Sequence, residues 1–140
     1  MMQARSSVVV PASAERVFAF IADPANDRQW RSHLIASRGT VDAVGDRVTQ
    51  TYSQDGRSKT VELSVAEYDR PNRLTYALTE PVRARLSFTF RTEDGGTRVS
   101  ASMSATLSGA LALFESRAQS ELEKVLKADL TRLKAALESH

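Results

Sequence analysis

The chain has 140 residues, which is enough for one domain with a sizeable core but short for two. Its composition of 41% hydrophobic and 26% charged residues, with six Gly and four Pro, excludes a collagen-like, disordered or low-complexity chain. Nineteen Lys and Arg against seventeen Asp and Glu leave a net charge of only +2, and because the basic residues are scattered rather than clustered, we expect no nucleic-acid partner.

The first quarter of the chain predicts a strand followed by two short helices. Ser6, Val8 and Val10 are predicted to lie on a first strand. Ser13 is suited to cap a helix whose apolar positions lie within residues 17–21. Asp23 and Pro24 begin a second short helix, because Asp caps well and Pro suits the first helical position.

Period-two alternation dominates the middle of the sequence. A weaker strand around residues 48–52 ends at a turn over residues 54–56, and further turns are predicted at residues 70–72 and 94–96. The alternation indicates an antiparallel meander with one packed face and one solvated face. The residues expected on the packed face are Val48, Gln50 and Tyr52; Val61, Leu63 and Val65; Leu74, Tyr76 and Leu78; Ala84, Leu86, Phe88 and Phe90; and Val99, Ala101, Met103, Ala105 and Leu107.

The C-terminal part of the chain carries the clearest helical pattern. Between Leu111 and Leu137, apolar residues recur at intervals of three and four, and no Pro or Gly follows Gly109. Such a helix is about 45 Å long, which is enough to cross a sheet. We therefore predict an α+β fold in which a curved antiparallel sheet of about seven strands wraps around the C-terminal helix, with two short helices after the first strand. Residues 1–140 are expected to form a single domain, with space between sheet and helix that side chains need not fill.

The sequence carries no signal for a membrane or for secretion. Its longest apolar run falls far short of the ~20 residues that span a bilayer, and the N-terminus lacks the apolar stretch of a secretory signal. The absence of cysteine excludes a disulfide framework. We therefore expect a cytoplasmic protein without stable membrane insertion, and the oligomeric state stays open.

Several segments carry a resemblance to a known superfamily. They are VVVPASAERVFAFIADPANDRQW, AVGDRVTQ, VAEYDRPNRLTYAL and FTFRTEDGGTRVSASMSATL, followed by the long amphipathic tail. Through them the whole chain resembles the SRPBCC or START-like helix-grip superfamily, which includes START lipid-transfer domains, the major birch pollen allergen and polyketide cyclases/dehydrases. The resemblance implies a cavity between the sheet and the long helix that takes an apolar or aromatic small molecule, lipid-like or polyketide-like. Members act as carriers, enzymes or chaperone cofactors, and the fold does not choose among these activities.

Common catalytic and cofactor motifs are absent from the sequence. It has no nucleophile elbow, no zinc-protease motif, no phosphate-binding Gly-rich loop and no dinucleotide fingerprint, so we expect no cofactor. With two histidines, one of them the last residue, and no cysteine, we expect no metal site. His33 is the candidate catalytic residue, because an aldol cyclisation or dehydration near neutral pH needs a general acid or base. The alternative for His33 is a surface residue that ends a helix.

The ligand-binding candidates outside the long helix combine polar and apolar side chains. Gln50, Tyr52 and Tyr76 are polar residues at inward positions of otherwise apolar strands, as in a pocket with a few placed polar groups. Alternatively the tyrosine rings pack in the core with their hydroxyls reaching solvent, and a register error of one residue would turn all three side chains outward. Trp30 is either a pocket wall or an anchor between the short helices and the sheet. The apolar candidates are Leu63, Leu86, Phe88, Phe90 and Met103.

Four further candidates lie near the start of the long helix: Leu111, Phe114, Glu115 and Ala118. Phe114 beside the small Ala118 would shape a cavity floor, and the alternative is ordinary core. Glu115 lies at the edge of the apolar stripe, so it is either a buried acid with a raised pKa or a solvated acid paired with an arginine.

The sequence is compatible with three functions. We favour binding of a small hydrophobic molecule for carriage or sensing, because the inward residues are mostly apolar and no acid–base pair is evident. The second is a cyclase or dehydratase that pre-folds an aromatic or polyketide-like substrate, with His33 or a tyrosine moving the proton. The third is an interaction module without a small ligand, on the solvated sheet face. That face is expected to carry Arg73, Arg83, Arg85, Arg91 and Arg98.

Overall fold

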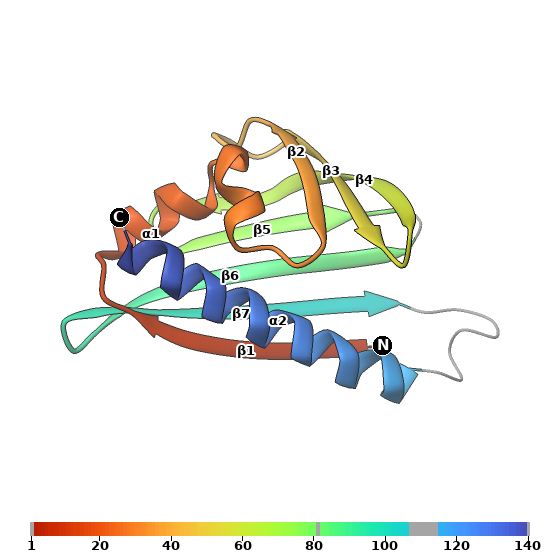
Figure 1. The fold of residues 1–140 in the computed structure, drawn as a ribbon. Coiled ribbons are helices and arrows are strands. Elements are labelled where there is room, and N and C mark those ends of the chain that lie inside the picture. The colour runs from red at the N-terminus through yellow and green to blue at the C-terminus, as the bar shows by residue number, and fades with distance from the viewer. Residues whose placement is uncertain (1, 81, 107–114, 140) are drawn as a thin grey trace.

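The computed structural model describes residues 2–80, 82–106 and 115–139. Within these residues the chain forms one antiparallel sheet of seven strands, in the order β1-β7-β6-β5-β4-β3-β2, together with two short helices and one long helix (Figure 1). The strands are β1 (Met2–Val10), β2 (Leu34–Gly39), β3 (Arg47–Gln54), β4 (Arg57–Asp69), β5 (Arg73–Leu78), β6 (Arg83–Glu93) and β7 (Gly96–Thr106). The helices are α1 (Ala14–Ile21), the 3-10 helix η1 (Pro24–Gln29) and α2 (Glu115–Glu138).

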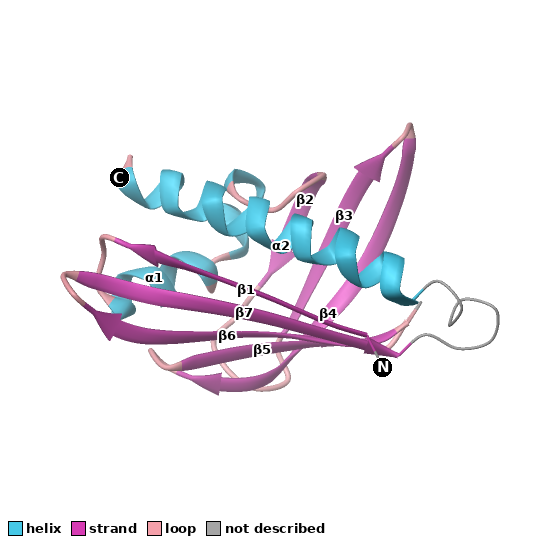
Figure 2. Cartoon of the chain, turned by 90° about the horizontal axis from the view of Figure 1, so that it is seen from below, coloured by secondary structure: helices cyan, strands magenta, loops and turns pink. Residues whose placement is uncertain are grey.

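The sheet curves around the long helix α2. Figure 2 shows α2 running along the concave side of the sheet, with β3 and β4 rising beside it. The predicted α+β helix-grip fold is confirmed, including the two short helices after the first strand. The residues at which we expected the long helix to begin lie outside the described part of the chain. No helix of the described residues is long and apolar enough to cross a membrane.

Strand β2 has no counterpart in the sequence prediction. It pairs with β3 alone, at the edge of the sheet, and its register shifts between Leu34 and Ala36. Only Leu34 of this strand is buried, and Ile35 is 47% exposed. Because an edge strand with one buried residue shows no alternation of apolar and polar residues, periodicity could not reveal it.

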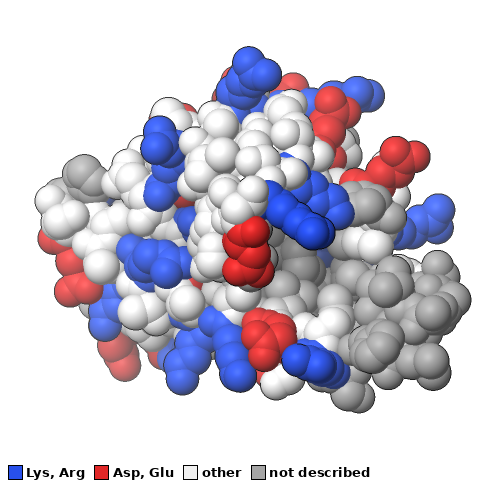
Figure 3. Space-filling view, turned by 45° about the vertical axis from the view of Figure 1, so that its right-hand side comes forward, with Lys and Arg blue, Asp and Glu red and all other residues white. Residues whose placement is uncertain are grey.

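Charged side chains of both signs are interspersed on the surface seen in Figure 3, in keeping with the small net charge. On the solvated face of the sheet, Glu67 lies 3.2 Å from Arg73 and 3.4 Å from Arg85. Glu93 pairs with Arg98 at 2.6 Å. Three of the arginines predicted on this face are therefore balanced by neighbouring carboxylates.

Side-chain caps begin the two short helices, as the sequence predicts. The Ser13 side chain accepts a hydrogen bond from the backbone N–H of Arg16 (3.2 Å), and the Asp23 side chain accepts one from Ala25 (3.0 Å). Pro24 occupies the first position of η1. Each cap satisfies a helix N–H that would otherwise lack a partner. The caps thus fix where the segment between β1 and β2 turns.

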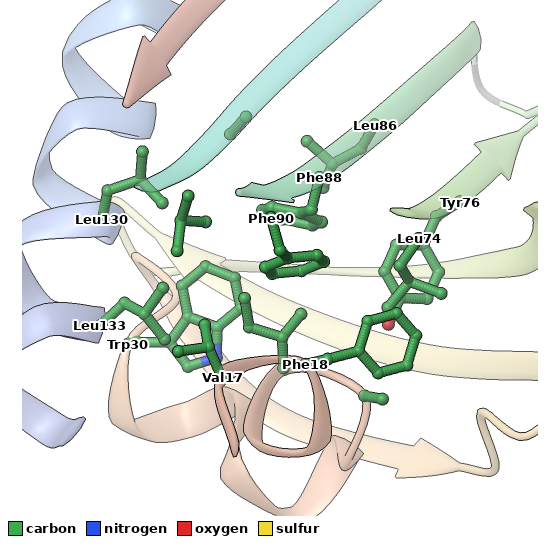
Figure 4. Packing of buried hydrophobic residues seen from close by; sticks show 14 of the residues in the cluster. Val17, Phe18, Trp30, Leu74, Tyr76, Leu86, Phe88, Phe90, Leu130 and Leu133 are labelled. Atoms are coloured by element: carbon green, nitrogen blue, oxygen red, sulfur yellow. The ribbon is translucent and has the colours of Figure 1, made fainter. Parts of the chain in front are cut away.

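The core lies between α1, α2 and the concave face of the sheet (Figure 4). Phe18 of α1 packs edge-on against Phe90, with ring centroids 5.4 Å apart. Trp30, which follows η1, packs in the same way against Phe88 at 5.8 Å. Such aromatic pairs contribute about 0.5–1.5 kcal/mol beyond the area they bury. From α2 the core receives Leu126, Leu130, Leu133 and Leu137.

Candidate ligand-binding site

A cavity of about 220 Å³ lies against the concave face of the sheet. Its walls come from strands β3 to β7 and from the segment between η1 and β2. The described residues that line it are Arg31, Gln50, Tyr52, Val61, Leu63, Tyr76, Leu78, Ala84, Leu86 and Met103. Most of these side chains are apolar, and the polar ones gather around Arg31.

Several residues predicted from the sequence come together in this cavity. Tyr76 lies opposite Leu86 in the neighbouring strand, and Leu86 lies opposite Met103. Directly paired residues share one face of a sheet, so the inward parity assigned to these strands is correct. The predicted residues that line the cavity are Gln50, Tyr52, Leu63, Tyr76, Leu86 and Met103.

A chain of hydrogen bonds runs from Arg31 to the buried carboxyl group of Asp27. Arg31 Nη2 donates to the Tyr52 hydroxyl (3.3 Å), which donates to Gln50 Oε1 (2.5 Å). Gln50 Nε2 donates to Asp27 Oδ2 (3.1 Å), and the same oxygen accepts from Ser37 Oγ (2.7 Å). Each link donates toward Asp27. The Tyr52 proton is therefore used in the bond to Gln50, and Arg31 is the donor at the cavity end of the chain.

The long helix holds Arg31 in place through Asp129. Arg31 Nε lies 3.3 Å from Asp129 Oδ2, and the Arg31 side chain is only 13% exposed. Asp129 Oδ1 accepts hydrogen bonds from the backbone N–H of Ser32 (2.9 Å), from its hydroxyl (2.5 Å) and from Arg132 Nη2 (2.7 Å). The Arg31 guanidinium also lies over the Trp30 ring, 5.3 Å from its centroid. These contacts leave the guanidinium little freedom to move away from the cavity.

Burial changes the ionisation of the acids around Arg31. It raises the pKa of Asp27 above the usual 3.8, although the hydrogen bond from Ser37 and the charge of Arg31 act in the opposite direction. Burial also raises the pKa of Tyr52, and it raises the pKa of Tyr76 far above the usual value of 10. Both phenols therefore stay protonated at neutral pH and can donate hydrogen bonds.

Four predicted site residues lie away from the cavity lining. Trp30, Phe88 and Phe90 are buried in the core and are not among the described residues that line the cavity. Of the two interpretations of Trp30, its packing on Phe88 supports the anchor. His33 is exposed, adopts φ +62° before β2, and accepts a hydrogen bond from the Ser53 N–H at its backbone carbonyl. Since its side chain is not part of the described lining, we assign it no chemical step.

The candidates on the long helix lie at the edge of the described structure. Leu111 and Phe114 fall outside the described residues, and Glu115 is the first residue of α2. Ala118 packs against the small cluster that contains Ala84, a cavity-lining residue. Contact of these four residues with a ligand stays a prediction.

Three charged residues that the sequence analysis did not select build the polar part of the site: Asp27, Arg31 and Asp129. Asp129 left a signal, because it interrupts the apolar stripe of the helix between Leu126 and Leu130. A charge on a buried stripe needs a partner, since burying it unpaired is costly. Asp27 and Arg31 left none, because they lie in a short segment where no periodicity marks the inward side.

Comparison with known proteins agrees with this architecture. Residues 1–138 match the family described as "Polyketide cyclase / dehydrase and lipid transport". The chain belongs to this family. The match supports membership of an SRPBCC-like superfamily, as the resemblance in the sequence implied. No curated protein matches the chain.

Solved structures similar to this member of the polyketide cyclase/dehydrase and lipid-transport family share its fold. The protein TTHA0849 from Thermus thermophilus is 18% identical, with 98% of this chain and 97% of that chain covered and a TM-score of 0.82. NE0264 from Nitrosomonas europaea is 11% identical, with 99% and 95% covered and a TM-score of 0.82. The di-domain ARO/CYC BexL from the BE-7585A biosynthetic pathway is 17% identical, with 99% and 47% covered and a TM-score of 0.81. At these identities the likeness shows the fold alone.

Proposed function

We propose that residues 1–140 form a domain that binds a small apolar or aromatic molecule, lipid-like or polyketide-like, on the concave face of the sheet. The observation that carries this proposal is the cavity of about 220 Å³, with mostly apolar walls and a few polar groups around Arg31. Protein interiors leave few voids larger than a water molecule. Ligand sites, in contrast, combine apolar walls with a small number of placed polar groups. Carriage or sensing of such a molecule fits the lipid-transport part of the family description.

The walls suit a ligand whose shape is not closely specified. Val61, Leu63, Leu78 and Leu86 present branched aliphatic side chains from three neighbouring strands. Met103 adds a flexible thioether, which adapts to irregular shapes and packs well against aromatic rings. The site therefore favours an apolar body over a polar one.

A titration with 2-acetylnaphthalene, followed by backbone amide NMR, tests the proposal. Saturable shifts are expected at the amides of the lining residues in β3 to β7. Val61→Trp places a large ring in the cavity and should weaken binding by about tenfold or more. Thr60→Trp is the matched control, since Thr60 is exposed and its neighbour Val61 lines the cavity from the other face of the strand. Equal affinity of the folded V61W and T60W variants, or no saturable shift in the wild type, would overturn the proposal.

A cyclase or dehydratase is the second candidate, and the protonated donors at the cavity favour it. In an intramolecular aldol condensation a methylene carbon between two carbonyl groups loses a proton to solvent and bonds to a distant carbonyl carbon, whose oxygen becomes an alkoxide. The protein must hold the two carbons together and stabilise the developing alkoxide. Arg31 and Tyr76 line the cavity and could donate hydrogen bonds to that oxygen. The candidate also fits the cyclase/dehydrase part of the family description and the likeness to an ARO/CYC protein.

Turnover of a short poly-β-ketone thioester, followed by the absorbance of an aromatic product, tests the second candidate. Wild-type protein should accelerate cyclisation, and Tyr76→Phe should slow it by about 10²-fold while the thioester still binds. A wild-type rate no higher than that of V61W would exclude this candidate and leave the binding proposal intact.

A further inference from the structure

The Arg31 guanidinium has hydrogen-bonding capacity that the described residues do not use. A guanidinium carries five N–H donors. Within the described part of the chain, Nε meets Asp129 and one N–H of Nη2 meets the Tyr52 hydroxyl, while Nη1 has no partner. The described residues contain one fully buried side-chain nitrogen or oxygen without a partner, and this atom is Nε1 of Trp30. Nη1 is therefore not sealed in the core, and Arg31 is one of the residues that line the cavity.

The carboxylates near Arg31 do not occupy all of its guanidinium donors, so a ligand carboxylate can still bind there. Asp129 Oδ2 lies 3.3 Å from Arg31 Nε, and Asp129 Oδ1 accepts hydrogen bonds from Ser32 and Arg132. Asp27 is linked to Arg31 by hydrogen bonds through Gln50 and the Tyr52 hydroxyl, and its charge also acts on the guanidinium. No carboxylate is among the described residues that line the cavity.

A second spare donor lies in the same cavity. The Tyr76 hydroxyl has no hydrogen-bond partner among the described residues, although Tyr76 is only 7% exposed and lines the cavity. The phenol stays protonated, so it offers its proton to an acceptor rather than competing for one. Arg31 and Tyr76 thus present donors, with apolar walls on the remaining sides.

Resting on the proposed function, we propose that the cavity selects molecules whose apolar body ends in a single carboxylate, which binds the Nη side of Arg31 and accepts a hydrogen bond from Tyr76. A planar carboxylate matches the fork of a guanidinium and can accept two parallel N–H···O bonds. A group with two negative charges fits less well, because one guanidinium already shared with Asp129 would have to balance it. A neutral head group would leave the guanidinium donors without a charged acceptor in a poorly solvated site.

Two ligands that differ only in the head group test this selectivity. 2-Naphthoate and 2-acetylnaphthalene share the naphthalene ring and nearly the same shape, but only the former is an anion at pH 7. We expect calorimetric titration of the wild type to give about tenfold or more tighter binding of 2-naphthoate. Weaker or equal binding of 2-naphthoate, with saturable binding of 2-acetylnaphthalene, overturns the carboxylate proposal alone. Failure of both ligands to bind contradicts the proposed function instead.

Variants of Arg31 test whether this residue is the source of the preference. Arg31→Met should abolish the advantage of 2-naphthoate over 2-acetylnaphthalene, while Arg31→Lys should keep part of the advantage through its charge. Arg73→Met on the solvated sheet face is the control, because Arg73 pairs with Glu67 and is not among the described residues that line the cavity, and it should change neither affinity. If R31M does not fold, the comparison of R31K with the wild type still shows whether Arg31 causes the preference for 2-naphthoate. A full naphthoate preference in either variant, or its loss in R73M, contradicts the assignment to Arg31.

Discussion

The two faces of the sheet use arginine in opposite ways. On the solvated face, Glu67 lies between Arg73 and Arg85, and all of these side chains are at least 40% exposed. On the concave face, Arg31 is nearly buried, and its carboxylate partner Asp129 comes from a helix at the other end of the chain. Exposed pairs contribute little to stability because water and salt screen them. The position of Arg31 instead depends on contacts that form only when the whole fold is assembled.

Of the variants compared between the two faces, Asp129→Ala should cause the largest loss of unfolding free energy. Asp129→Ala deprives Arg31, Ser32 and Arg132 of a common acceptor and leaves a buried cation without its partner. Breaking a buried ion pair in this way costs about 3–5 kcal/mol of unfolding free energy. Glu62→Ala removes an exposed partner of Arg47 and should cost less than about 1 kcal/mol. Urea denaturation of both variants measures the contrast.

A cost for D129A within about 1 kcal/mol of that for E62A would contradict this account of Asp129. It would mean that Arg31 and Arg132 find other partners or solvent when the carboxylate is removed. The position of Arg31 at the cavity would then not depend on the long helix.

Removal of the Tyr52 hydroxyl should cause the next largest loss of unfolding free energy. Tyr52→Phe removes the group that accepts from Arg31 and donates to Gln50, and it leaves both partners in a half-buried site. We expect a loss of about 1–3 kcal/mol in unfolding free energy. The adjacent Thr51 makes a hydroxyl contact with Thr60 at 3.0 Å on the solvated face, and Thr51→Val should cost about 0.5 kcal/mol or less. Equal costs for Y52F and T51V, measured in urea, would show that the hydrogen-bond chain adds no stability.

The same contrast between the faces explains what the sequence could predict. Strands such as β6 alternate strictly, so the inward positions of Leu86 and Phe88 follow from parity alone. Parity also selects Tyr76 and Gln50, because they are polar residues at inward positions. It does not reveal that Phe88 packs in the core whereas Leu86 lines the cavity, since that depends on where α1 and Trp30 cover the sheet.

The pairing of the polar residues with one another was beyond prediction, because these contacts join distant segments of the chain. Ser32 and Asp129 are 97 positions apart, and the Gln50–Asp27 hydrogen bond joins β3 to the 3-10 helix. No local pattern encodes such a pair. A residue such as Arg31 becomes recognisable only when the helix that supplies its carboxylate is placed on the sheet.

Carboxyl groups on the two faces should also make the unfolding free energy depend on pH in opposite directions. We expect these changes in unfolding free energy to be smaller than those of the variants above. Burial raises the pKa of Asp27, so the folded state keeps that proton to higher pH than the unfolded chain. Stability from this group is complete below about pH 3.8 and is lost as the pH rises through the folded pKa. The hydrogen bond from Thr75 lowers the pKa of Glu67, so its contribution is present above about pH 4.5 and is lost as the pH falls through the folded pKa.

Asp27→Asn and Glu67→Gln separate these contributions. The amide oxygen introduced by D27N can still accept from Ser37 and Gln50 but does not titrate, so this variant should lose the decline in unfolding free energy above pH 3.8. E67Q should instead lose the decline toward acid pH, and by less, because Glu67 is solvated and its ion pairs are screened. Unfolding free energies measured at several pH values for the wild type and both variants decide the matter. If D27N and E67Q changed the slope in the same direction, the Asp27 carboxyl group would be ionised as readily as a surface acid, and its burial beside Gln50 would not control its charge.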